Sequence, residues 1–172
     1  IAMQIEYSLI ERSVERELVP VAKALNIGLT AWSPLSGGVL SGKYHGKDAG
    51  KDAKEQGRMS SDMMKDFKPD EQRADRIVTA LKTVSGEVGR SVAQVALAWL
   101  RYRAVPVIPI LGARKLSQLQ DNLASLDLVL SPEQVNKLDD ASKIDLGFPY
   151  SMYERGLVRN IAYGGMRDQI IA

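Results

Sequence analysis

The chain has 172 residues, 45% of them hydrophobic and 26% charged, which suits one folded domain. A net charge of +2 gives no indication of nucleic-acid or membrane partners, and no apolar run approaches the ~20 residues that span a bilayer. The absence of cysteine excludes disulfides, thiolate catalysis and Cys-ligated metals, and the single histidine disfavours a zinc site. The opening residues lack a signal-peptide pattern, so we expect a cytoplasmic protein.

The first 32 residues predict a strand–helix–strand unit. Residues 3–10 are rich in β-formers, and residues 13–26 repeat apolar side chains every three to four positions, as an amphipathic helix does. We expect Ser13 to be the N-cap of this helix and Pro20 to interrupt it. Residues 27–32 form a second strand, so the unit has the size of a parallel βαβ crossover.

The next segment, residues 42–70, is polar, rich in glycine and lysine, and has no apolar period. It is longer than most loops in compact domains, so we expect a functional flap or a mobile insertion.

Regular structure resumes with helices at about 71–88 and 91–103. A third strand at 104–112 is apolar enough to be buried on both faces, and a helix follows at 116–126. The last clear helix begins at a capping box, with Ser131 as N-cap, Pro132 at its first position and Gln134 closing the box. The tail, residues 145–172, has only weak periodicity.

Alternating strands and helices predict an α/β fold with a parallel sheet and right-handed crossovers. Three strands leave two unpaired edges and too little apolar surface to cover both faces. We therefore expect residues 1–172 to be a single partial domain that either pairs with another polypeptide or is the carboxyl-terminal piece of a larger fold. A strand so close to Ile1, with no initiating methionine, favours the second. The side chains that we expect to face the missing part are Ile5, Leu29, Ala31, Val107 and Ile108.

Ligands of parallel βα folds bind where strands end, and the end of the second strand is the most informative here. Trp32 offers a flat face to an aromatic ring, while Gly37 and Gly38 let backbone amides approach an anion and Lys43 adds charge. Two interpretations remain open from the residues alone: an anion-binding loop, or a core-capping Trp32 followed by an ordinary turn. The pattern is neither a GxGxxG nor a Walker loop.

The third strand end, "LGARKLSQLQDN", is a second candidate site. Gly112 ends the strand, and Arg114 precedes a helix whose N-terminus favours anions. Gln118 and Asn122, four residues apart, share one helix face and suit an adenosine with a ribose phosphate. A solvated helix start is the alternative. One elongated ligand that spans both strand ends, such as a dinucleotide, would unite the two sites.

Three segments in this order and spacing, "QIEYSLIER", "TAWSPLSGGVLSGKY" and "GARKLSQLQDNLASLDLVLS", resemble the aldo-keto reductase superfamily from Gln4 to about residue 144. The similar branch includes potassium-channel β-subunits and bacterial reductases. The resemblance implies a (β/α)8 TIM barrel that binds NADP(H) without a Rossmann domain. This chain would supply about the last three βα units, strands six to eight, and the carboxyl tail.

The resemblance also implies roles in cofactor binding. Gln4 corresponds to the contact with the nicotinamide carboxamide and Trp32 to the stacking aromatic. The loop that lines the pyrophosphate corresponds to Ser33, Pro34, Leu35, Gly37, Gly38 and Lys43. A basic residue of the family's long flap corresponds, in a loose alignment, to Arg58. The segment that holds the adenosine 2′-phosphate and adenine corresponds to Gly112, Arg114, Gln118, Asp121 and Asn122. Because many members have arginine where Gln118 stands, a preference for NADP over NAD rests mainly on Arg114.

The family's catalytic tyrosine, lysine, aspartate and histidine come from earlier strands, so this chain is expected to hold no catalytic residue, and Tyr7, Tyr44 and Lys43 are no substitutes for them. The complete protein is then expected to reduce aldehydes or ketones to alcohols with NADP(H), and it requires the upstream half of the barrel. It could also form a homo-oligomer. The alternatives are a non-catalytic NADP(H)-binding regulatory subunit and a partial barrel without activity of its own.

Overall fold

The computed structural model describes residues 1–44, 69–153, 155–166 and 169. In chain order, these residues form the following strands (β), α-helices (α) and 3-10 helices (η): β1 (Ala2–Glu6), η1 (Ser13–Glu15), α1 (Leu18–Ala24), β2 (Gly28–Trp32), η2 (Ser36–Ser41), α3 (Glu71–Val88), α4 (Val92–Trp99), η5 (Leu100–Tyr102), β3 (Val107–Pro109), α5 (Leu116–Leu123), η6 (Ala124–Asp127), α6 (Pro132–Ser142), α7 (Tyr150–Tyr153) and α8 (Gly156–Tyr163).

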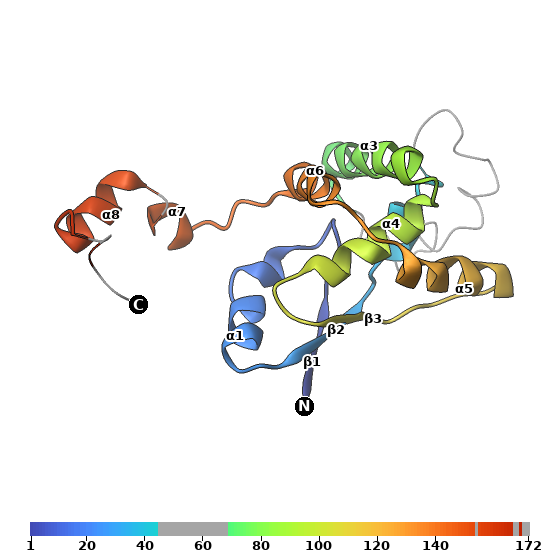
Figure 1. Cartoon of the computed structure of the whole chain (residues 1–172), viewed down its shortest axis with the longest axis horizontal. Coiled ribbons are helices and arrows are strands. Elements are labelled where there is room, and N and C mark those ends of the chain that lie inside the picture. Colours follow the sequence, from blue (N-terminus) through green and yellow to red (C-terminus); the bar gives the residue numbers. More distant parts are fainter. Residues whose placement is uncertain (45–68, 154, 167–168, 170–172) are drawn as a thin grey trace.

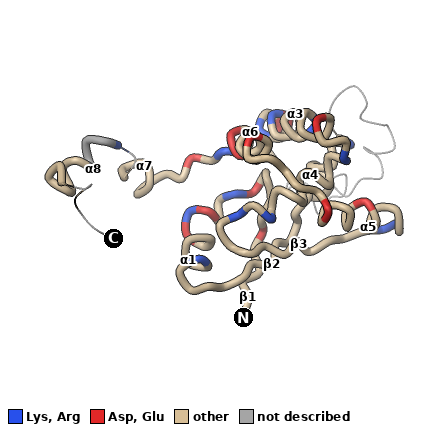
Figure 2. The backbone as a smooth tube through the Cα atoms, in the orientation of Figure 1, with Lys and Arg blue, Asp and Glu red and all other residues tan. Residues whose placement is uncertain are grey.

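The described strands form one parallel sheet in the order β1–β2–β3. Figure 1 shows α4 beside this sheet, α3 and α6 together beyond it, and α1 and α5 at opposite ends. The expected α/β fold of parallel strands and helices is therefore confirmed for these residues. Charged residues gather on α3, α6 and the segment around η1, whereas β2 and β3 carry none (Figure 2).

The two faces of the sheet differ in what covers them. Ile5, Leu29, Ala31 and Val107 are buried in one hydrophobic core with α4 residues, including Trp99. The expectation that these four side chains face a missing part is therefore wrong, because alternate residues of a strand point to opposite faces and these four point toward the helices.

The opposite face of the sheet is open. Ile108 is 66% exposed and Ile110 is 43% exposed, so the segment 104–112 is not buried on both faces. Of the five side chains expected to face a missing part, only Ile108 lies on the open face. Because residues 104–112 are almost all apolar, the sequence did not show which of their side chains point to the buried face and which to the open face.

The helices that cover the sheet begin and end at the signals in the sequence. α3 has the expected bounds, with the Asp70 carboxylate accepting a hydrogen bond from the Arg73 amide and Gly89 in a left-handed C-cap. The predicted capping box of α6 is present, with Pro132 in its first turn. α4 is shorter than predicted because η5 takes over at Leu100.

The first helical segment differs from the prediction. It divides into η1 and α1, and Pro20 lies in the first turn of α1, where its missing amide hydrogen costs no intrahelical bond. Ser13 is the first residue of η1 and not an N-cap. Its amide and hydroxyl both donate to the Glu11 carboxylate instead.

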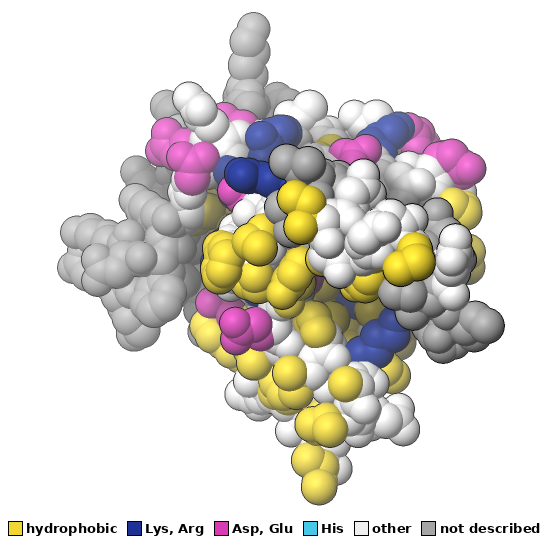
Figure 3. Space-filling view, turned by 90° about the vertical axis from the view of Figure 1, so that its left-hand side faces the viewer, with side chains coloured by type: hydrophobic (Ala, Val, Ile, Leu, Met, Phe, Trp, Pro, Cys, Tyr) yellow, Lys and Arg dark blue, Asp and Glu magenta, His cyan; other side chains and the backbone are white. Residues whose placement is uncertain are grey.

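The carboxyl-terminal segment forms two helices that the weak periodicity did not predict, α7 and α8. They lie apart from the sheet and its helices at the end of an extended connection from α6 (Figure 1). Figure 3 views this side of the molecule, where hydrophobic side chains gather near the centre of the face. Phe148 is 81% exposed and Tyr153 is 63% exposed.

Candidate cofactor site

The register of the sheet aligns the candidate nicotinamide residues on its open face. Gln4 pairs with Thr30, and Glu6 pairs with Trp32, so Gln4 and Trp32 are diagonal neighbours on adjacent strands. Trp32 is 39% exposed. Its ring therefore belongs to the open face of the sheet, opposite the core between the sheet and the helices.

The loop after β2 contains a run of left-handed residues. Leu35 has φ −107° and ψ 11°, and it is followed by Ser36 at φ 46°, Gly37 at φ 62° and Gly38 at φ 96°. Within this loop, the Ser36 amide donates to the Ser33 carbonyl at 2.8 Å and the Gly38 amide donates to the Leu35 carbonyl at 2.9 Å, so these two amides hold the turn together. Ser33 is also left-handed, at φ 52°, and such non-glycine strain concentrates at functional sites.

The side chain of Lys43 folds back over this loop. A Cβ added to Gly38 would lie 3.0 Å from Lys43 Cε and 3.1 Å from its Nζ, so the lysine occupies the space that the glycine leaves free. The ammonium group also lies 4.8 Å from the centre of the Tyr44 ring. The structure therefore brings one cation to the glycine turn, as the sequence predicted. Pro34 is buried beneath the loop.

The segment after β3 is held by Gln118. Its side-chain oxygen accepts hydrogen bonds from the Arg114 amide at 3.0 Å and from the Lys115 amide at 3.2 Å, which closes the turn before α5. Gly112, Arg114 and Gln118 are all exposed at this turn. The side-chain oxygen of Gln118 therefore stabilises the turn before α5.

Asp121 and Asn122 lie farther from solvent. Asp121 accepts hydrogen bonds from Ser91 Oγ at 2.9 Å and from Gln94 Nε2 at 2.7 Å, which ties α5 to the N-terminal turn of α4. Asn122 is 6% exposed, so it does not share an exposed face with Gln118. Their roles toward adenosine stay predictions. Arg58 and His45 lie outside the described residues.

Glu6 is a residue that the motifs did not single out. It occupies the same row of the open face as Trp32. Burial, reinforced by the nearby negative charge of Glu11, raises the pKa of its carboxyl group above the usual value. The sequence signal for Glu6 was the alternation in "QIE", which places Gln4 and Glu6 on the same face of a strand.

The described residues contain two further hollows, neither of which includes the candidate cofactor residues. One of about 590 Å³ lies between η1 and the segment after α6, and one of about 300 Å³ lies beside α1. The described part of the chain holds no cluster of acidic or histidine side chains that could bind a metal ion. No helix within it is long and apolar enough to cross a membrane.

Residues 1–143 match the Aldo/keto reductase family. The chain belongs to this family. This aldo/keto reductase chain is 35% identical over 142 residues to a probable voltage-gated potassium channel subunit beta from Oryza sativa subsp. japonica, covering 81% of the chain and 43% of that protein.

Two further relatives are named as oxidoreductases. An uncharacterized oxidoreductase, YrpG, from Bacillus subtilis is 32% identical over 80% of the aldo/keto reductase chain and 39% of its own length. An aryl-alcohol dehydrogenase (NADP+) from Phanerodontia chrysosporium is 30% identical over 92% of the chain and 40% of its own length. The chain thus spans about two fifths of the length of these relatives.

Proposed function

We propose that this chain is the cofactor-holding, carboxyl-terminal part of an NADP(H)-dependent reductase that converts aldehydes or ketones to alcohols. The observation that carries the proposal is the placement of Gln4 and Trp32 on one open sheet face, beside the left-handed loop that Lys43 covers. The printed name of one relative includes NADP+, which agrees with the choice of cofactor.

The residues present suit such a cofactor. Trp32 offers an exposed ring for stacking on nicotinamide, and the Gln4 amide can both donate to and accept from a carboxamide. The Lys43 ammonium beside the glycine turn suits a pyrophosphate, and Arg114 suits a ribose phosphate. When bound, the reduced nicotinamide would supply the hydride; the contribution of this chain is to hold and orient it.

The finer fold assignment is part of the same proposal. β1, β2 and β3 would be the sixth, seventh and eighth strands of a (β/α)8 barrel, with Gln4, Thr30 and Ile108 pointing into its interior. The acid–base residues would come from the upstream strands of the complete protein. The exposed apolar side chains of α1 and α5, at the two ends of the sheet, support this proposal because neighbouring βα units would cover them.

Titration of the complete protein with NADPH tests the role of Trp32. We expect the affinity to fall about five- to tenfold in Trp32→Ala, since stacking of an aromatic ring contributes on the order of 1–1.5 kcal/mol. Trp32→Phe keeps an aromatic ring and should retain most of the affinity. An unchanged dissociation constant in Trp32→Ala would refute the stacking assignment.

A second candidate function is a non-catalytic NADP(H)-binding regulatory subunit. The name of the relative from Oryza sativa, a channel subunit, favours it. Turnover of a test aldehyde by the complete protein separates the two functions: NADPH binding without turnover supports the regulatory subunit. A third candidate is a partial barrel that assembles from separate chains. The intact mass of the denatured polypeptide decides it, because denaturation separates chains that are not covalently joined.

A further inference from the structure

The carboxyl-terminal end of α6 has an unusual charge arrangement. The last turn of this helix contains Asp139 and Asp140 and no basic residue. Acidic side chains are unfavourable there, because the carbonyl groups at the end of a helix already carry partial negative charge. Lys143 follows as the C-cap of the helix, and further positive charge comes from other segments.

Four arginines from two other parts of the chain supply it. Arg12 Nη1 donates to the Asp139 carbonyl at 3.1 Å, and Arg76 Nε donates to the Ala141 carbonyl at 2.8 Å. Arg73 donates to the carbonyls of Ser142 at 2.6 Å and Lys143 at 2.9 Å. Arg16 donates to the Asp145 carbonyl at 2.9 Å. We call Arg12, Arg16, Arg73 and Arg76 the arginine clamp.

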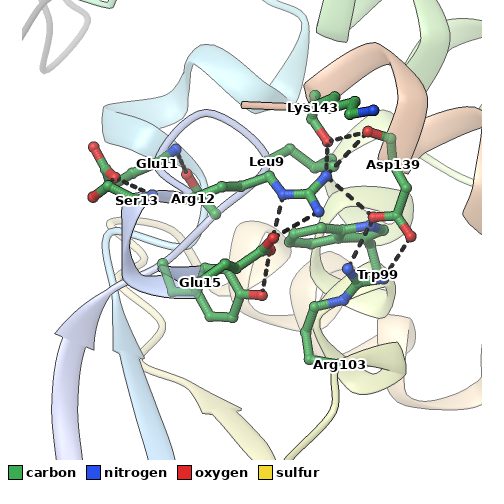
Figure 4. A network of polar contacts seen from close by, with 12 residues as sticks. Leu9, Glu11, Arg12, Ser13, Glu15, Trp99, Arg103, Asp139 and Lys143 are labelled. Carbon is green, nitrogen blue, oxygen red and sulfur yellow. Dashed lines mark hydrogen bonds and ion pairs between the residues drawn. The ribbon is translucent and has the colours of Figure 1, made fainter. Parts of the chain in front are cut away.

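The clamp is joined to the loop after β1. Besides its bonds to the end of α6, the Arg73 guanidinium donates to the Ile10 carbonyl at 3.3 Å. Arg12, which is only 8% exposed, makes a two-pronged contact with Glu15, at 2.8 Å from Nε and 2.9 Å from Nη2 (Figure 4). Such charge-assisted, two-pronged bonds fix orientation as well as distance.

A continuous series of hydrogen bonds leads from the candidate cofactor site to the clamp. The Tyr7 amide donates to the Trp32 carbonyl at 3.4 Å, and the Tyr7 hydroxyl donates to Glu15 at 2.7 Å. Glu15 holds Arg12, and Arg12 donates to Ser142 Oγ at 2.7 Å. The end of β2 is therefore connected to the residue at which the carboxyl-terminal segment leaves α6.

We propose that the arginine clamp positions the carboxyl-terminal segment from Lys143 onward and couples its placement to the ends of β1 and β2. Arg73 and Arg12 are positioning residues in this proposal, since they act through the backbone of the segment and touch no candidate ligand group. As a result, the direction in which the carboxyl-terminal segment leaves α6 depends on the position of the loop after β1.

The first test needs no ligand. Hydrogen exchange is measured in the complete protein for peptides that cover residues 143–147, where the Gly147 amide donates to the Asp145 carboxylate at 2.7 Å. We expect exchange to be about tenfold faster in Arg73→Met, because loss of the Arg73 bonds to the backbone makes local opening of this segment easier by about the net free energy of one hydrogen bond. Exchange in Arg73→Lys should be intermediate. Arg90→Met, at the other end of α3, is the matched control and should leave the exchange unchanged.

If Arg73→Met fails to fold, Arg16→Met replaces it, because Arg16 bonds only the outer end of the clamp at Asp145. Unchanged exchange over residues 143–147 in a folded Arg73→Met or Arg16→Met variant overturns the positioning role.

The second test measures the coupling and rests on the proposed function. We expect NADPH to slow exchange over residues 143–147 in the wild type. In Tyr7→Phe, which loses only the hydroxyl bond to Glu15, we expect unchanged NADPH affinity but a loss of this response. NADPH binding without any change of exchange in the wild type overturns the coupling. Failure of NADPH to bind refutes the proposed function instead, and the ligand-free test still decides the clamp.

Discussion

α4 and the helices at the two ends of the sheet are all rich in apolar residues, but they differ in what covers them. Every α4 residue from Ala93 to Trp99 is buried. By contrast, α1 and the residue after it expose Leu18, Val21 and Leu25 in one row, and α5 exposes Leu116, Leu119 and Leu123 in another. Each row has the spacing of a single helix face. We call the buried cluster between the sheet and α4 the finished core, in contrast to α1, α5 and the open face of the sheet, which leave apolar side chains exposed.

The largest expected effect concerns the chain on its own. Because one sheet face and two helix rows are uncovered, we expect isolated residues 1–172 to unfold without a cooperative transition and to bind hydrophobic dyes. The complete protein should melt cooperatively. A monomeric, cooperative melt of the isolated chain, followed by circular dichroism, would show that these surfaces need no cover.

A matched pair of leucines sharpens the comparison in the complete protein. Leu97, in the middle of the finished core, is 1% exposed, and Leu97→Ala should cost about 3 kcal/mol in urea unfolding. Leu25 is 64% exposed here. If another βα unit covers α1, Leu25→Ala should cost about 2 kcal/mol. A cost below about 0.5 kcal/mol would mean that this row stays in solvent.

Within the finished core, Asp139 joins α6 to α4 and to the segment after it. Its carboxylate accepts hydrogen bonds from Arg103 at 2.8 and 3.2 Å and from Trp99 Nε1 at 3.0 Å. The Arg103 guanidinium also stacks 4.0 Å from the centre of the Trp99 ring. Arg12 Nη1 lies 3.2 Å from the same carboxylate. Asp139→Asn therefore weakens the counter-charge of two nearly buried arginines, so we expect a loss of about 2 kcal/mol of stability, below the range for fully buried pairs.

The control for Asp139 is an exposed ion pair on the same helix. Lys137 contacts Glu87 with both side chains well exposed, so Lys137→Met should change the free energy of unfolding by less than about 0.5 kcal/mol. Equal effects of the two substitutions would contradict the distinction between core and surface pairs.

The smallest expected effect lies on the open face, at Glu6. Its pKa is raised in the folded chain, so the unfolded state loses its proton first as the pH rises, and stability falls with pH from the unfolded pKa upward. Glu6→Gln removes this penalty. We expect a slightly higher melting temperature than wild type at pH 7 and no difference near pH 3. An equal shift at both pH values would show that the charge of Glu6 is not the cause.

The elements of this fold were largely predictable because their signals are local. Asp70 and Gly89 mark the two ends of α3, and the Ser131 capping box marks the start of α6. The glycine turn after Trp32 was likewise visible, since left-handed backbone favours glycine.

The long-range contacts could not be predicted in the same way. Arg12 and Ser142 are 130 residues apart, and nothing in either neighbourhood indicates that they meet. The direction of the strand side chains also escaped prediction, because Val107 and Ile108 are both apolar and only the neighbouring strands decide which one faces the helices. Positive φ at Ser33 and Ser36 is similarly imposed by the surrounding fold.

The contact between Gly38 and Lys43 has a consequence for how this family can vary. At φ 96° a side chain at position 38 would be strained, and its Cβ would lie 3.0 Å from Lys43 Cε, so the end of the lysine side chain would have to move. Among related chains, a side chain larger than hydrogen at position 38 should therefore coincide with a shorter or differently directed residue at position 43. The location of the positive charge next to the turn therefore depends on both residues, Gly38 and Lys43, which are five positions apart in the sequence.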